Sequence, residues 1–126
     1  AGQVERRTVY ASDGSSKEAV IAYSLGDYCT TEEGGVNASL ILNLEFTRDH
    51  ASGVTTLTDL GYTPIATVDF GPEAKQRYAV LNMDNAIALY ESNYYDRIPE
   101  EIYQTLLTRR EKLADTVSPK EDTGTK

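Results

Sequence analysis

Apolar and polar residues alternate most clearly between Val36 and Thr47. Because successive side chains of a strand point to opposite faces, this alternation predicts a strand. One face would carry Leu40, Leu42, Leu44 and Phe46, and the other Ser39, Ile41, Asn43 and Glu45. Such a strand has one covered and one wetter face, so another element must cover the leucine face.

A helical pattern spans Pro99 to Val117. Pro99 suits the first helical turn, and Glu100 and Glu101 complement the positive end of the helix dipole. One apolar stripe runs along it, formed by Ile102, Tyr103, Leu106, Leu107, Leu113 and Val117. We expect this helix to cover the leucine face of the strand.

The beginning of the chain reads as a strand at Val4–Ala11, which is followed by turn residues. Residues Lys17–Asp27 have two interpretations. They suit a helix capped by Ser15, or a hairpin that turns at Asp13-Gly14 and returns along Glu18–Leu25. We favour the hairpin, because the return segment is rich in strand-forming residues and the flanking residues strongly favour a turn.

Tyr62–Phe70 is predicted to be a further strand. The preceding segment, Asp49–Gly61, is ambiguous. Its apolar residues Val54, Leu57 and Leu60 are spaced by three, which would suit a short helix ending at Gly61. Three threonines and a glycine weaken that helix.

Residues Gln76–Glu91 are interpreted as a hairpin with its turn at Asp84-Asn85, two residues that tolerate turns. A single long helix from Pro72 is the competing interpretation. Together the segments predict an α+β fold: an antiparallel sheet of about five strands with the C-terminal amphipathic helix packed on one face. Residues 1–117 would form a single domain, and residues 118–126 a disordered polar tail.

The net charge of the chain indicates which classes of partner it is suited to bind. Twenty acidic and twelve basic residues give a net charge of −8. A field of that sign disfavours direct binding to nucleic acids and to anionic membranes, and favours a partner with a basic surface. No apolar run approaches the ~20 residues of a membrane helix, and no charged-then-apolar leader opens the chain. We therefore expect a cytoplasmic protein, with an exported mature form still open.

Catalytic and metal-binding signals are weak. The chain has one histidine, His50, and one cysteine, Cys29, which do not supply a nucleophile–base pair or a zinc site at a readable spacing. Four acidic residues could gather at one end of the sheet but are better interpreted as turn and solvating residues: Asp69, Asp84, Glu91 and Asp96. We predict no catalytic residue, no metal and no cofactor.

Tyrosines are concentrated directly before and inside the C-terminal helix. Tyrosine combines a large apolar ring with a hydroxyl and is enriched at protein interfaces. Polar residues that can adapt to a partner lie among these tyrosines. The predicted partner-binding residues are Tyr90, Tyr94, Tyr95, Asp96, Arg97 and Tyr103.

These features favour a non-catalytic protein-binding domain, such as a small acidic regulator, inhibitor or assembly subunit, that acts by occupying a macromolecular partner. Homo-oligomer formation is a related possibility. The alternative is a small-ligand-binding domain or compact enzyme with a pocket lined by Tyr and Asp between the sheet and the helix.

Overall fold

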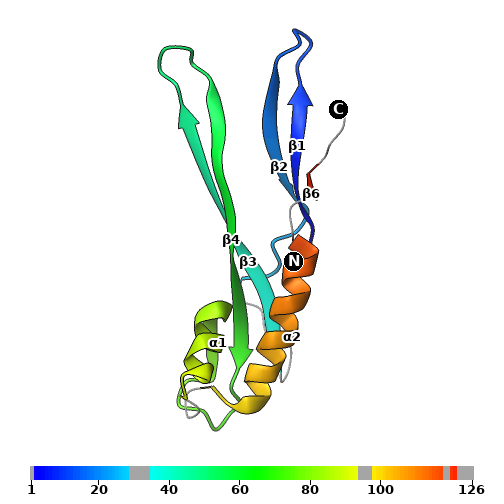
Figure 1. Ribbon diagram of the computed structural model, residues 1–126. Coiled ribbons are helices and arrows are strands. Elements are labelled where there is room, and N and C mark those ends of the chain that lie inside the picture. The colour runs from blue at the N-terminus through cyan, green and yellow to red at the C-terminus, as the bar shows by residue number, and fades with distance from the viewer. Residues whose placement is uncertain (1, 29–34, 94–97, 118–119, 122–126) are drawn as a thin grey trace.

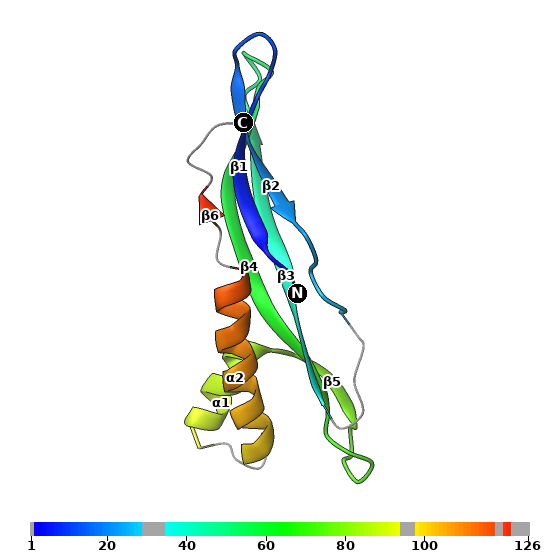
Figure 2. The ribbon, with the colours of Figure 1, turned by 90° about the vertical axis from the view of Figure 1, so that its right-hand side faces the viewer.

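The computed structural model describes residues 2–28, 35–93, 98–117 and 120–121. Two hairpins project in the same direction from a base that contains both helices (Figures 1 and 2). The predicted α+β class is confirmed. In chain order the elements are β1 (Val4–Tyr10), β2 (Ser16–Ala22), β3 (Val36–Arg48), β4 (Thr55–Asp69), β5 (Tyr78–Asn82), α1 (Met83–Glu91), α2 (Glu100–Val117) and β6 (Lys120–Glu121).

The strands lie in two sheets rather than in the predicted single sheet of about five. The orders are β2-β1-β6 and β3-β4-β5, and all pairs are antiparallel except that of β1 with the short β6. The chain after β2 explains the separation. The N–H of Leu40 in β3 donates to the carbonyl of Leu25 at 3.0 Å, and Thr67 Oγ1 donates to the carbonyl of Tyr28 at 2.8 Å. Irregular chain at Leu25 therefore occupies the outer edge of β3 at Leu40, and no strand pairs there among the described residues.

The first hairpin, β1–β2, confirms the favoured interpretation, and the helix at residues 17–27 is wrong. Its turn is fixed by Asp13, whose Oδ1 accepts the backbone N–H of Ser15 at 2.9 Å and its hydroxyl at 2.6 Å. Gly14 follows with a φ of +86°, a conformation that glycine adopts without steric cost. The turn chemistry thus outweighs the weak helix-capping signal. We call this hairpin the first arm.

The second hairpin, β3–β4, is the second arm, and it contains the strand that the alternation predicted. Its register pairs Val36 with Val68 and Leu40 with Pro64, so even-numbered residues of both strands share one face there. Leu40 N–H points to Leu25, away from β4. Pro64, opposite Leu40, therefore has its missing N–H on the outer side of β4, where β5 does not reach and no ladder bond is lost.

A β-bulge explains why the short helix expected within Asp49–Gly61 is wrong. Glu45 pairs with Asp59 but the next residue, Phe46, pairs with Leu57, so β4 has one extra residue at this point. The bulge places Leu57 and Leu60 on the same face although they are three residues apart. In an unbulged strand this spacing would separate them, which is why the sequence resembled a helix. β4 therefore begins at Thr55 instead of Tyr62.

In the region Gln76–Glu91 neither the predicted hairpin nor the competing long helix is correct. Its first half is β5, as the hairpin required, but its second half is α1. The helix begins after Asn82, whose side-chain Oδ1 accepts the N–H of Asn85 at 3.1 Å and so caps the first turn. Asp84 and Asn85 therefore start a helix rather than a turn.

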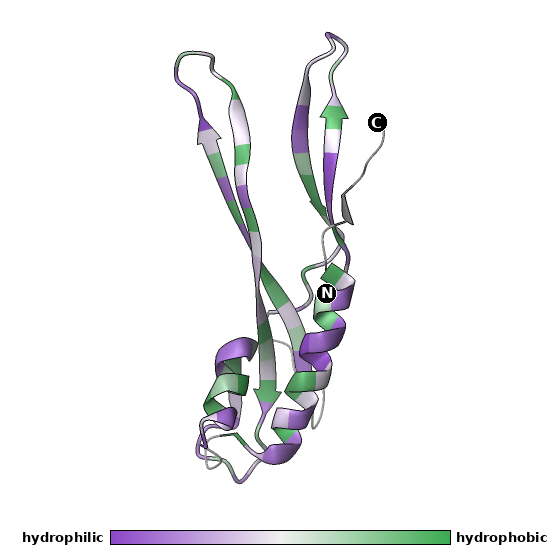
Figure 3. Cartoon of the chain, in the orientation of Figure 1, coloured by the Kyte–Doolittle hydropathy of each residue, from purple (hydrophilic) through white to green (hydrophobic). Residues whose placement is uncertain are grey.

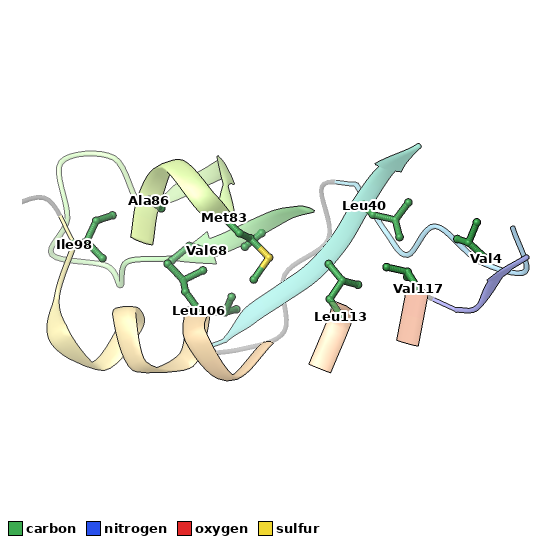
Figure 4. Close-up of a cluster of buried hydrophobic side chains, with 11 residues drawn as sticks. Val4, Leu40, Val68, Met83, Ala86, Ile98, Leu106, Leu113 and Val117 are labelled. Carbon is green, nitrogen blue, oxygen red and sulfur yellow. The ribbon is translucent and has the colours of Figure 1, made fainter. Parts of the chain in front are cut away.

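The C-terminal helix α2 is confirmed. Together with α1 it covers the even-numbered face of the lower part of the sheet β3-β4-β5. The buried cluster between them holds residues from β3, β4, both helices and the start of β1 (Figure 4). Leu106 of α2 and Met83 of α1 have no exposed surface. Burial of such side chains contributes about 1.5–3 kcal/mol each.

The predicted tail lies mostly outside the described residues. Lys120 and Glu121 pair with Glu5 and Arg6 of β1 as β6. The division into a domain and a disordered tail stays a prediction.

Candidate interaction surface

The apolar face of the second arm continues beyond the helices that cover its lower part. This upper region forms an apolar stripe with three residues from each strand: Leu42, Leu44 and Phe46 of β3, and Leu57, Leu60 and Tyr62 of β4. Apolar and polar residues alternate along the arm in Figure 3. Leu44 keeps 43% of its surface exposed and Phe46 keeps 59%.

Element lengths explain why the stripe is not covered. The 13-residue β3 spans about 43 Å at the usual strand rise. The 18-residue α2 spans about 27 Å at the helical rise. The expectation that the C-terminal helix would cover the whole leucine face is therefore wrong for its upper part. This difference in length was already present in the sequence.

The first arm covers only the β4 side of the stripe. β2 packs against β4, and Leu57 is only 7% exposed. A hollow of about 330 Å³ lies between the arms, lined by Thr8, Ser16, Lys17, Glu18 and residues 54–57. On this inner face Arg6 forms an ion pair with Glu18 at 2.7 Å. The wall that the first arm presents is therefore polar, and it leaves Phe46 open.

Two of the six predicted partner-binding residues lie together at the other end of the molecule. The rings of Tyr90 in α1 and Tyr103 in α2 stack, with their centroids 3.9 Å apart and their planes at 14°. The Tyr103 hydroxyl donates to Glu91 Oε1 at 2.9 Å. This hydrogen bond is the main reason why the pKa of Tyr103 is raised above its ordinary value. The other four predicted residues, Tyr94, Tyr95, Asp96 and Arg97, lie outside the described residues.

Arg110 joins both helices to the sheet beside the lower end of the stripe. Its Nε donates to Asp84 in α1 at 2.7 Å, and its Nη1 donates to the Tyr62 hydroxyl at 3.3 Å. Its guanidinium also lies 5.7 Å from the centre of the Tyr62 ring. The hydrogen bond to Asp84 is the largest cause of a raised pKa at Arg110. Arg110 therefore links α2 to α1 and to β4 beside Tyr62.

The acidic residues that could have gathered for catalysis have separate partners. Asp69 accepts two hydrogen bonds from Arg77, at 2.9 and 3.1 Å. Asp84 binds Arg110, and Glu91 binds Tyr103. Asp96 lies outside the described residues. Among the described residues, no group of three or more His, Cys, Asp or Glu is placed to hold a metal ion.

Two hollows lie along α2. One, of about 440 Å³, includes Asp69, Glu101 and Arg109 in its wall, and the other, of about 230 Å³, includes Arg109 and Lys112. The described residues that line these two hollows include no tyrosine. Of the two helices that the structure describes, neither is long and apolar enough to cross a membrane.

Comparison with protein-family models, with curated proteins and with solved structures finds no match to this chain.

Proposed function

We propose that this protein is a non-catalytic binding domain that acts by occupying a protein partner, as a small acidic regulator, inhibitor or assembly subunit does. The observation that carries the proposal is the open β3 side of the apolar stripe. Leu44 and Phe46 continue the face that forms the core below, yet neither the helices nor the first arm buries them.

Energetics support a partner at this place. A two-stranded ribbon is marginally stable in water on its own, and a large exposed aromatic side chain gains free energy when another surface covers it. Aromatic residues at the centre of an interface commonly carry much of the binding energy. Phe46 is the exposed aromatic residue of the stripe and would serve as that anchor.

Charge supports a basic partner. The chain has a net charge of −8, and the opposite face of the second arm places Glu45 directly across from Asp59. A basic surface would approach faster and bind with better complementarity than an acidic one.

The tyrosine-rich segment would add a second contact at the helical end. Tyr90 and Tyr103 are half-buried in their stack and pack against the core cluster. Their role in binding, like that of residues 94–97, stays a prediction. Its most direct support is the sequence composition of the segment.

The test is capture of a partner from an extract of the producing organism, followed by measurement of the complex mass. The variants are Leu44→Ser and Phe46→Ser, which remove apolar surface from the stripe. The matched control is Ile41→Ser, because Ile41 is 39% exposed on the opposite face of the same strand. The proposal expects a complex of defined stoichiometry with the wild type and with Ile41→Ser.

Phe46→Ser should weaken that complex by about tenfold or more, as expected for loss of an aromatic anchor. Circular dichroism must show that the variant stays folded. A complex that survives both stripe substitutions unchanged, or the absence of any protein complex with the wild type, would contradict the proposal.

A further inference from the structure

β3 is the end strand of its sheet, and among the described residues no strand pairs with its outer edge next to the exposed part of the stripe. Asp69 N–H donates to the Gly35 carbonyl, so odd-numbered β3 residues form the hydrogen-bonded pairs with β4. Leu40 N–H points outward to Leu25. The same alternation directs the N–H and C=O groups of Leu42 and Leu44 outward, beyond the segment that occupies the edge at Leu40.

The two edges of the second arm differ in how they are protected against a further strand. The outer edge of β4 carries Pro64, which lacks an N–H, and the bulge at Thr58, which interrupts the ladder. β2 also packs against β4. Natural proteins use prolines and bulges to block edge pairing. From Leu42 to Phe46, the β3 edge has neither a proline nor an extra residue.

The side chains along this edge indicate which residue types an added strand would carry. Leu44 and Phe46 lie on the apolar face, so an added strand would place apolar side chains beside them at every second position. On the other face Glu45 lies directly across from Asp59, and both are exposed. Like charges in this arrangement repel, and a basic side chain on a neighbouring strand would relieve that repulsion.

We propose that an extended segment of the partner adds as a strand to the outer edge of β3 between Leu42 and Phe46. The segment has apolar residues at alternate positions and lysine or arginine between them. This inference rests on the proposed function and names the chemistry of its partner. Main-chain hydrogen bonds to Leu42 and Leu44 hold the strand, and the apolar stripe selects its side chains.

A second copy of this chain fits the edge less well. Two copies would bring Glu45 and Asp59 of each copy close together in chains that each carry a net charge of −8. A partner helix would bury the stripe but leave the outward backbone groups of Leu42 and Leu44 without hydrogen bonds. The experiment distinguishes these occupants.

The test begins with selection from a displayed library of random twelve-residue peptides on the intact chain. Selected peptides are expected to alternate apolar and polar residues and to contain lysine or arginine. The best peptide is then synthesised with single N-methyl groups at alternate amides, which remove one donor while keeping every side chain. Methylation of an amide that faces β3 should weaken binding about threefold to tenfold, and methylation of its neighbour much less.

Binding is compared between the wild type, Phe46→Ser, Glu45→Gln and the control Ile41→Ser, with amide hydrogen exchange as the second readout. The peptide should slow exchange at Leu42 and Leu44, bind Phe46→Ser at least tenfold more weakly, and bind Ile41→Ser as it binds the wild type. Glu45→Gln should reduce the preference for basic peptides.

Three results would overturn the inference: no peptide selected by the intact chain, selected peptides with helical rather than alternating periodicity, or insensitivity to N-methylation at every amide. A chain that is dimeric by itself, with Leu42 and Leu44 protected from exchange, would assign the edge to a second copy instead. Each of these results leaves the proposed function standing if a protein complex still depends on Phe46.

Discussion

Phe46 and Leu57 are register partners on one face of the second arm, yet Leu57 is 7% exposed and Phe46 is 59% exposed. Two apolar side chains at directly opposed positions thus have different environments. The first arm packs over the β4 side and stops short of the β3 side. This asymmetry separates a residue that stabilises the fold from one that is available to a partner.

The asymmetry predicts different stability effects at the two positions. Leu57→Ala should reduce the free energy of unfolding by about 2 kcal/mol or more, because it removes buried apolar surface between the arms. Phe46→Ala should change it by about 0.5 kcal/mol or less, as for most surface substitutions. Urea unfolding followed by circular dichroism measures both. Equal losses for the two variants would mean that Phe46 is part of the packed structure.

The packing of α2 gives a second prediction. Leu106 is fully buried between α2 and the sheet, so Leu106→Ala should cost about 2–5 kcal/mol. Leu89→Ala is the matched control, because Leu89 also lies on a helix but is 37% exposed. It should cost much less by the same denaturation measurement. A small effect at Leu106 would show that α2 is not docked on the lower sheet.

The junction of β5 with α1 gives a third prediction. Asn82→Ala should cost about 1 kcal/mol of stability, because Asn85 N–H loses its side-chain acceptor. Asn82→Asp keeps an acceptor at the same place and should restore most of the loss. Thermal unfolding of the three proteins provides the comparison. If Asn82→Asp is as unstable as Asn82→Ala, the cap does not explain where the helix begins.

The tyrosine stack gives a pH prediction. The hydrogen bond to Glu91 raises the pKa of Tyr103 above its ordinary value of 10.0. Because the folded-state pKa is the higher one, the stabilisation is complete below pH 10 and is lost as the pH rises through the folded-state pKa. Subtracting the phenolate absorption curve of Tyr103→Phe from that of the wild type isolates this group.

The isolated curve should have its midpoint above the ordinary value, and Glu91→Gln should move the midpoint down. A midpoint at the ordinary value in the wild type would indicate that Tyr103 and Glu91 do not form their hydrogen bond in solution. Such a result would remove the support that this bond gives to the Tyr90–Tyr103 stack.

Local patterns predicted those parts of the fold whose structure is determined by nearby residues. The alternation around Leu40 predicted β3, the Asp13 turn predicted the first hairpin, and the caps and stripe predicted α2. The predictions that were wrong concern features determined by residues far apart in the sequence. The bulge opposite Glu45 removed the alternation from β4, and irregular chain at Leu25 separated two sheets that composition alone could not distinguish from one.

The candidate surface was only partly accessible to sequence reasoning. The tyrosine content drew attention to Tyr90 and Tyr103, which the structure places in one stack. Phe46 was expected to be covered, since alternation shows which residues share a face but not which element reaches that face. The exposure of Phe46 follows from the relative lengths and positions of β3, α2 and the first arm.

The most direct test of the central claim is photo-crosslinking in cells of the producing organism, with benzoyl-phenylalanine placed at one position of the second arm. We expect a defined protein crosslink from position 46 and none from position 41, which lies on the opposite face of the same strand. Equal crosslinking from both positions, or a crosslink from position 41 alone, would contradict the claim that the apolar stripe is the binding surface.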